Sequence, residues 1–187
     1  MTRTHQPMTI DRVQIENERT KTFVFQQPLP AEPGQFVMAW LPDVGEKPFS
    51  IADADPFALT VVAVGPFSEA LHRLDAGDRV WIRGPLGHGF RIEGQRLLLI
   101  GGGYGVAPLL YLAQEAIARG CRAEACIGAR TAAEVLLVDA FTAAGAAVGV
   151  ATEDASLGTE GLVTAAVEAA IERQRPDTVY ACGPVGM

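Results

Sequence analysis

The sequence is poor in cysteine, in positive charge and in long apolar runs, and each shortage excludes a class of protein. Its three cysteines are an odd number with no C-x-x-C pair, so we expect neither a disulfide framework nor a metal site. Fifteen basic residues against 22 acidic ones give a net charge of −7 and no reason to expect nucleic-acid binding. No stretch approaches the roughly 18 apolar residues of a membrane span, and the amino terminus lacks the apolar core of a signal peptide. We therefore expect a cytoplasmic protein with reduced thiols and no membrane contact.

What is present is a globular composition, 49% apolar over 187 residues, whose pattern changes near residue 94. Before that point, short runs rich in β-branched and aromatic residues alternate with turns, as in a small antiparallel barrel. After it, strands alternate with helices, which is typical of a parallel sheet covered on both faces. We predict a β-barrel domain over 1–94, followed by an α/β domain with a parallel sheet over 95–187.

The expected elements follow from periodicity and from turn residues. In the first domain we expect strands at 22–25, 35–41, 57–64 and 79–83, with one or two helical turns within 68–74. The segment 47–51 is expected to lie between two strands, and a strand start punctuated by proline is the alternative. In the second domain we expect strands at 97–100, 123–127, 147–151 and 178–182, and helices at 106–119, 132–144 and 162–173.

One stretch organises the second domain. Four branched apolar residues are followed by a turn with four glycines in five positions, and a helix then begins at Val106. Glycines let the backbone approach a pyrophosphate, and the unpaired N–H groups of the helix start then face it. The third glycine of the dinucleotide fingerprint is replaced by Pro108. A tight turn between buried elements is the alternative interpretation.

Six short motifs stand in register along nearly the whole chain. Their order and spacing resemble the ferredoxin–NADP reductase superfamily, and within it the electron-transfer subunits of type B dihydroorotate dehydrogenase. The motifs are Pro33-Gly34-Gln35-Phe36, Lys47-Pro48-Phe49-Ser50, Gly65-x-x-Ser68-x-x-Leu71, Gly84-Pro85-x-Gly87, Gly101-Gly102-Gly103-x-Gly105-x-x-Pro108 and Cys182-Gly183-Pro184.

The resemblance implies an FAD site in the barrel. A lysine at position 47, where the motif usually has arginine, places a point charge near the FAD phosphate or ring without a bidentate fork. The Ser50 hydroxyl or a neighbouring amide is expected at the flavin N5 edge. Phe67 stands where a small residue is usual, so it either hinders close approach of the backbone or stacks on an aromatic ring. The residues expected to bind FAD are Lys47, Pro48, Phe49, Ser50, Val62, Val64, Gly65, Phe67 and Ser68.

The resemblance also implies a site for a nicotinamide dinucleotide in the second domain. Arg130 stands where an adenosine ribose or its 2′-phosphate lies, although a solvated surface arginine fits equally well. Glu153, Asp154 and Ser156 are candidates to accept ribose hydroxyls, or they belong to a solvated loop. NAD versus NADP stays open, and the subgroup favours NAD. The residues expected to bind this dinucleotide are Gly101, Gly102, Gly103, Gly105, Val106, Arg130 and Asp154.

The motif Cys182-Gly183-Pro184 is expected to lie by the nicotinamide ring, with a thiol against the reacting ring and a glycine leaving room for it. A buried structural cysteine is the alternative. Ser50 and Cys182 are thus the candidate catalytic residues, and Cys121 and Cys126 are assigned to the core.

Members of this subgroup carry a [2Fe–2S] cluster on four cysteines that follow the Cys-Gly-Pro motif. This sequence contains no such ligands, so we expect either a chain that stops early or a cluster-free relative. The resemblance implies hydride transfer between NAD(P)H and FAD across a cleft between the domains. Electrons would then pass to a dihydroorotate dehydrogenase catalytic subunit in pyrimidine biosynthesis, within a dimer or heterotetramer. The alternatives are a reductase subunit of a sulfide dehydrogenase or hydrogenase, and a flavin-free nucleotide-sensing module.

Overall fold

The computed structural model describes residues 4–184, and the chain forms two compact units, Met1–Phe90 and Arg91–Met187. The division falls four residues before the predicted one. The reason is that residues just after Phe90 are held by the last strand of the second unit: the Tyr180 hydroxyl donates to the carbonyl of Arg91 at 2.5 Å and accepts the N–H of Glu93 at 3.2 Å.

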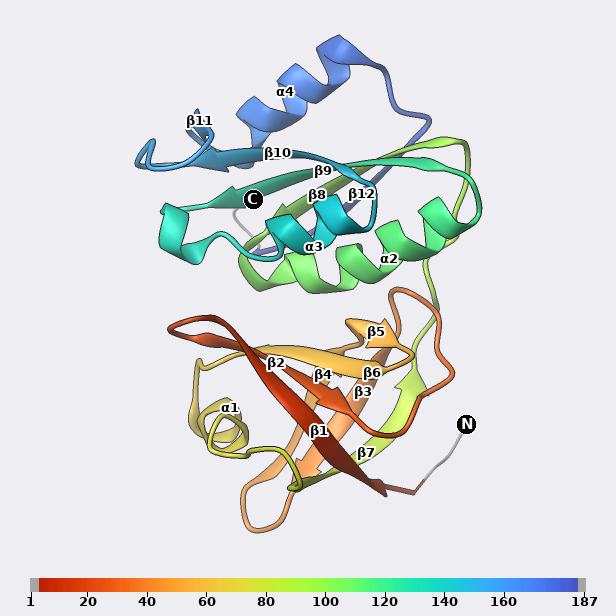
Figure 1. Cartoon of the computed structure of the whole chain (residues 1–187), viewed down its shortest axis with the longest axis vertical. Helices are drawn as coiled ribbons and strands as arrows, with labels where there is room; N and C mark the ends of the chain where they lie inside the picture. Colours follow the sequence, from red (N-terminus) through yellow and green to blue (C-terminus); the bar gives the residue numbers. More distant parts are fainter. Residues whose placement is uncertain (1–3, 185–187) are drawn as a thin grey trace. The chain divides into compact units, whose positions relative to one another are not determined.

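The first unit is a seven-stranded antiparallel sheet in the order β4-β3-β7-β1-β2-β6-β5 (Figure 1). Strands β4 and β6 are not hydrogen-bonded neighbours and still lie close together, as expected when a sheet curls into a barrel. The elements are β1 (Gln6–Asn17), β2 (Thr20–Phe25), β3 (Phe36–Leu41), β4 (Gly45–Ser50), β5 (Asp53–Ala54), β6 (Phe57–Val62), α1 (Pro66–Leu71) and β7 (Arg79–Leu86).

The core of the barrel is aromatic and aliphatic. The rings of Phe25 and Phe57 stack with their centroids 4.9 Å apart, and both side chains are fully buried. Strand β3 alternates as a half-buried strand should, with Val37, Ala39 and Leu41 turned inward. The predicted antiparallel barrel is confirmed.

The segment expected to lie between two strands is itself a strand, β4, so that prediction was wrong. β4 pairs only with β3 in the sheet and forms one of its edges. An edge strand tolerates proline because one side of its backbone has no ladder to complete, and this explains how Pro48 fits within β4.

The second unit is a five-stranded parallel sheet in the order β11-β10-β9-β8-β12. Helices α2 and α3 cover one face and α4 covers the other (Figure 1). The elements are β8 (Arg96–Gly102), η1 (Gly103–Gly105), α2 (Val106–Ala118), β9 (Arg122–Ala129), η2 (Ala132–Glu134), α3 (Val138–Ala143), β10 (Ala147–Thr152), β11 (Thr159–Glu160), α4 (Val163–Arg173) and β12 (Thr178–Cys182).

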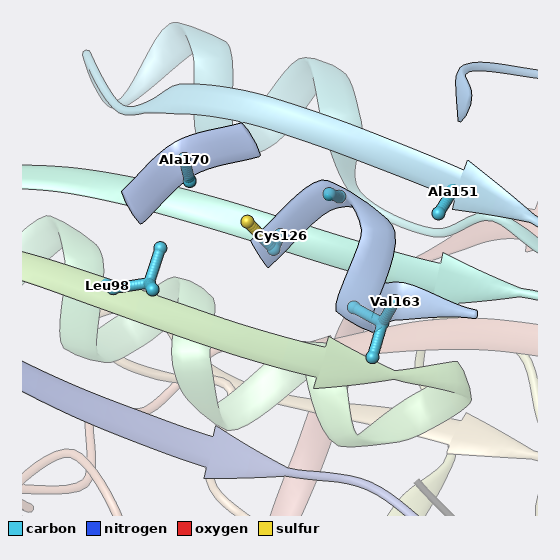
Figure 2. Packing of buried hydrophobic residues seen from close by; sticks show 6 residues of the cluster. Leu98, Cys126, Ala151, Val163 and Ala170 are labelled. Carbon is cyan, nitrogen blue, oxygen red and sulfur yellow. The ribbon is translucent and has the colours of Figure 1, made fainter. Parts of the chain in front are cut away.

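Small side chains let α4 lie close to its face of the sheet. Figure 2 shows Leu98, Cys126 and Ala151 of the strands facing Val163 and Ala170 of the helix. Cys126 is fully buried, and this burial raises the pKa of its thiol to about 11. The assignment of Cys126 to the core is therefore confirmed, and it stays a protonated, unreactive thiol.

The predicted helix over 132–144 is interrupted. The structure has a short 3₁₀ turn, η2, followed by extended backbone at Val135 and a left-handed residue, Leu137, with φ +62°. Helix α3 begins only after Leu137. A left-handed non-glycine residue cannot continue a right-handed helix, so the two pieces are separate.

The ion pair between Arg96 and Asp177 makes a testable contribution to the stability of the second unit. Asp177 Oδ1 accepts two guanidinium N–H bonds from Arg96, at 2.5 and 3.2 Å, and Oδ2 accepts the backbone N–H groups of Gln95 and Arg96. The hydrogen bond from Arg96 and then that from Gln95 lower the pKa of Asp177 to about 2. A lowered pKa in the folded state stabilises the fold above the ordinary value of 3.8, and the contribution disappears as pH falls toward about 2.

We therefore expect Asp177→Asn to lower the unfolding midpoint at neutral pH, with a difference from the parent that shrinks as pH falls from 3.8 toward 2. Thermal unfolding followed across this pH range measures the difference. Asp11→Asn is the control, because Asp11 is exposed and its ion pair is with the adjacent Arg12 at 3.4 Å. A difference in unfolding midpoint between Asp177→Asn and the parent that stays constant down to pH 2 would show that ionisation of Asp177 is not its cause.

Candidate functional site

The glycine-rich turn after β8 uses its glycines for two different purposes. A Cβ on Gly101 would lie 2.9 Å from Val106 Cγ2, and a Cβ on Gly105 would fall on the backbone of Cys182. These two glycines let the turn pack against α2 and against the end of β12. Gly103 is different, because its φ is +53° and no heavy atom lies within 4 Å of the Cβ position. The turn therefore leaves an open cradle at Gly103.

Helix α2 begins directly after this turn with no side chain capping its first N–H groups. The start of a helix carries partial positive charge, which favours an anionic ligand. The Val106 side chain is buried against Gly101 and its N–H donates to the carbonyl of Gly103, so Val106 shapes the turn.

A pocket of about 300 Å³ opens beside this cradle, within the second unit. It lies where β8 and β9 end and α4 begins, the edge of a parallel sheet at which such folds bind nucleotides. Its volume is at the lower end of the range for small-molecule sites. The lining residues are Gly102, Gly103, Gly128, Ala129, Arg130, Glu134, Glu153, Leu162, Val163, Thr164 and Pro184.

The charged groups of this pocket are one guanidinium and two carboxylates. Arg130 donates to both oxygens of Glu134, from Nε at 3.0 Å and from Nη2 at 2.5 Å. The hydrogen bond to Glu134 is the largest cause that raises the pKa of Arg130, and the charge of Glu153 adds to it. Arg130 thus lines the predicted site with two of its five N–H donors already paired to Glu134.

Asp154 is not among the lining residues, whereas its neighbour Glu153 is. The Asp154 carboxylate accepts hydrogen bonds from the N–H and the hydroxyl of Ser156, at 3.1 and 2.5 Å. These bonds lower the pKa of Asp154. Ser156 Oγ in turn accepts the N–H of Ala132 at 2.7 Å. Asp154 and Ser156 therefore fix the loop that supports η2.

Cys182 ends β12 and is half-buried, and burial raises the pKa of its thiol. The Gly105 backbone packs against Cys182 and Gly183, and Pro184 reaches the pocket. The turn after β8 and the Cys182-Gly183-Pro184 segment, 77 residues or more apart in sequence, thus meet at one edge of the sheet. The proposed contact between Cys182 and a nicotinamide ring stays a prediction.

In the first unit, the predicted FAD residues gather where β4 lies against α1. The rings of Phe49 and Phe67 lie 5.8 Å apart and Phe67 is buried, so Phe67 already has a packing partner inside the barrel. Gly65 lies in extended backbone, and no heavy atom lies within 4 Å of its Cβ position. Close approach to the backbone is therefore available at Gly65 despite the bulk of Phe67.

Ser68 is buried and its hydroxyl serves the turn before α1. Its Oγ accepts the N–H groups of Val64 and Gly65, at 2.9 and 3.1 Å, and donates to the carbonyl of Gly65 at 3.0 Å. Ser68 therefore shapes the Gly65 turn from beneath, which positions a ligand without requiring that Ser68 touch it.

The remaining FAD candidates are accessible. Lys47, Pro48, Ser50 and Val64 are exposed, and Val62 is half-buried. Alternation along β4 places Lys47 on the same face as Phe49, and Ser50 on the opposite face with Pro48. Lys47 lies on β4, the strand that contacts α1, and an exposed cation on that strand fits a phosphate-bearing cofactor such as FAD. The individual contacts of these residues with FAD stay predictions.

Sequence reasoning missed part of the pocket in the second unit. Gly128 lets α4 approach β9, because a Cβ there would lie 2.6 Å from Val163 Cβ. Leu162, Val163 and Thr164 begin α4, and Glu134 belongs to η2. The available signal was a glycine at the end of a predicted strand, next to Arg130, which favours close approach by another element.

The described residues contain neither a metal-binding cluster nor a membrane-spanning helix. Among residues 4–184, no three His, Cys, Asp or Glu side chains are grouped so that they could hold a metal ion. Within the same residues, no helix has the length and apolar character needed to cross a membrane.

An antiparallel barrel, followed by a parallel α/β unit with a glycine cradle at the ends of its strands, defines the ferredoxin reductase-like class of FAD- and NAD(P)-binding proteins. A solved structure from a study of flavin-based electron bifurcation, the NADH-dependent reduced ferredoxin–NADP oxidoreductase, aligns with a TM-score of 0.84 and 31% identity. The alignment covers 95% of this chain and 67% of that one. No family model matches the chain.

The curated relatives narrow this class. A probable dihydroorotate dehydrogenase B (NAD(+)) electron transfer subunit from Thermococcus kodakarensis is 42% identical over 96% of this chain and 75% of its own length. A protein of the same description from Methanothermobacter thermautotrophicus is 41% identical over 96% of this chain and 69% of its own length. The chain belongs to the family of dihydroorotate dehydrogenase B electron transfer subunits.

Proposed function

We propose that this chain passes reducing equivalents between NAD(H) and a bound FAD, and from there to a dihydroorotate dehydrogenase catalytic subunit in pyrimidine biosynthesis. FAD, when bound, supplies the capacity to accept a hydride and to release electrons to a partner. The observation that carries the proposal is the pocket beside Gly103, in a chain whose relatives bear this description.

The residues of the chain supply binding and orientation. The Gly103 cradle and the start of α2 hold the dinucleotide pyrophosphate, and the Glu134 and Glu153 side of the pocket takes the adenosine ribose. In the barrel, Lys47 and the Gly65 turn hold the FAD phosphates, and the Ser50 region lies at the flavin N5 edge. Cys182 lies against the nicotinamide ring. Hydride transfer then requires no acid–base dyad, because the protein has only to orient the two rings.

The proposal extends to assembly and location. The relatives are named as an electron transfer subunit, which supports a catalytic-subunit partner. We propose that the two assemble as a dimer or heterotetramer. The free thiols of Cys121, Cys126 and Cys182 favour a reducing compartment, in agreement with a cytoplasmic location.

A second candidate is a reductase subunit of another NAD(P)H-linked complex. It is favoured by the 31% identity and the TM-score of 0.84 with a protein described as an NADH-dependent reduced ferredoxin–NADP oxidoreductase. Co-purification separates the two candidates: a dihydroorotate-oxidising partner supports the first, and a partner of different activity supports the second.

The test of the flavin assignment is release of the bound cofactor by denaturation, followed by chromatography against FAD, FMN and riboflavin standards. The proposal expects FAD at close to one per chain. Protein that is folded and carries no flavin, even after incubation with FAD, would support a nucleotide-sensing module without flavin and contradict the proposal.

A further inference from the structure

Arg130 lines the pocket, and its guanidinium is hydrogen-bonded to a carboxylate of the same chain, that of Glu134. Arg130 and Glu134 are four residues apart, and two hydrogen bonds join Nε and Nη2 to the two carboxylate oxygens, at 3.0 and 2.5 Å. This is a bidentate pairing, the same geometry with which arginine grips a phosphate. Glu134 takes the Nε–H and one Nη2 N–H of Arg130, so a phosphate can bind this same bidentate face only by displacing Glu134.

Glu134 is held at this position by the loop that supports η2. Ser156 Oγ accepts the N–H of Ala132, the first residue of η2, and Asp154 fixes Ser156 through two hydrogen bonds. Glu153 lies on the same pocket wall and brings a second negative charge. If a phosphate took this face of Arg130, Glu134 would lose the pairing with Arg130, and two carboxylates would stand beside a dianion.

We infer that Glu134 is the residue that makes this pocket select NADH over NADPH. The inference rests on the proposed function and specifies how its nucleotide site discriminates. Ribose hydroxyls donate hydrogen bonds that carboxylates accept, so an unphosphorylated ribose suits Glu134 and Glu153. A 2′-phosphate is disfavoured there, because Glu134 already holds the bidentate face of Arg130 and the two carboxylates repel a dianion.

The experiment measures the affinities of AMP and 2′,5′-ADP (adenosine 2′,5′-bisphosphate) by calorimetry on the parent protein and on Glu134→Gln. These probes differ only in the 2′-phosphate and require no flavin turnover. We expect the parent to prefer AMP, and Glu134→Gln to shift the affinity ratio toward 2′,5′-ADP roughly tenfold, the scale of one charge-assisted hydrogen bond. The kcat/KM ratio for NADH and NADPH should shift in the same direction.

Two further variants keep the inference falsifiable. Glu115→Gln is the matched control, because it breaks another i,i+4 pair, with Arg119 at 3.3 Å, on a helix away from the pocket, and should leave the ratio unchanged. Adding Arg130→Gln to Glu134→Gln should abolish the gain for 2′,5′-ADP. A ratio that stays within twofold of the parent in Glu134→Gln would overturn the inference. A parent protein that binds neither probe would instead overturn the proposed nucleotide site.

Discussion

Replacing Gly105 with alanine is expected to destabilise the second unit by about 2–3 kcal/mol, the cost of forcing an atom into a packed interior. The added Cβ would fall on the carbonyl of Cys182, 2.6 Å from its carbon and 2.8 Å from the Gly183 nitrogen. These are backbone atoms of β12 and the residue after it, so no side-chain rotation relieves the overlap. The turn and the strand end must separate, which also disturbs the Gly103 cradle.

Thermal unfolding and ADP calorimetry measure the two consequences. For a unit of this size the expected loss corresponds to a fall in midpoint of roughly 10–20 °C, and ADP binding should weaken together with it. Gly149→Ala is the matched control, because its Cβ would meet only Ala166 Cβ at 3.7 Å and Cys126 Sγ at 3.9 Å. Equal midpoints for Gly105→Ala and Gly149→Ala would show that the turn does not pack on β12 as described.

Reversing the charge of Lys47 is expected to weaken FAD binding by roughly tenfold to a hundredfold, the range for losing one hydrogen bond to a charged group. Lys47 is exposed on β4 and, within residues 4–184, forms no ion pair, so its charge is available to a cofactor phosphate. Lys47→Glu removes that attraction and adds repulsion without disturbing a buried contact.

Fluorescence titration of flavin-free protein with FAD measures the affinity, and the unfolding midpoint confirms that the variant is folded. Arg79→Glu makes the same charge change at an exposed position at the start of β7 and should leave FAD affinity unchanged. If Lys47→Glu and Arg79→Glu weaken FAD equally, the effect is that of net charge and Lys47 is not part of the site.

Local patterns predicted the part of the site that is local in sequence. The apolar run of β8, its glycines and the helix that follows adjoin one another, so their geometry could be read from spacing. The structure distinguishes the roles of two glycines: Gly105 allows close packing, and Gly103 leaves open space. This distinction depends on the position of β12, which spacing does not reveal.

The rest of the pocket comes from segments that only the sheet order brings together. Three lining residues come after β9 in the sequence: Glu134 ends η2, and Leu162 and Thr164 lie at the start of α4. No spacing rule links them to Gly103. Glu134 was also hidden within a helix predicted as continuous, because the left-handed Leu137 carries no glycine or proline signal. Strand β4 was placed outside the strands in the preferred interpretation, with a strand start at proline as the alternative, because only its position at the sheet edge shows that Pro48 is compatible with a strand.

The account depends on two nucleotide sites in one chain that exchange a hydride, and anaerobic titration of the FAD-loaded protein with NADH tests it most directly. The account predicts that the visible absorbance of oxidised flavin bleaches in proportion to added NADH, reaching completion near one NADH per flavin, and that NADPH is much less effective. A protein that binds FAD and NADH and leaves the flavin oxidised would contradict it.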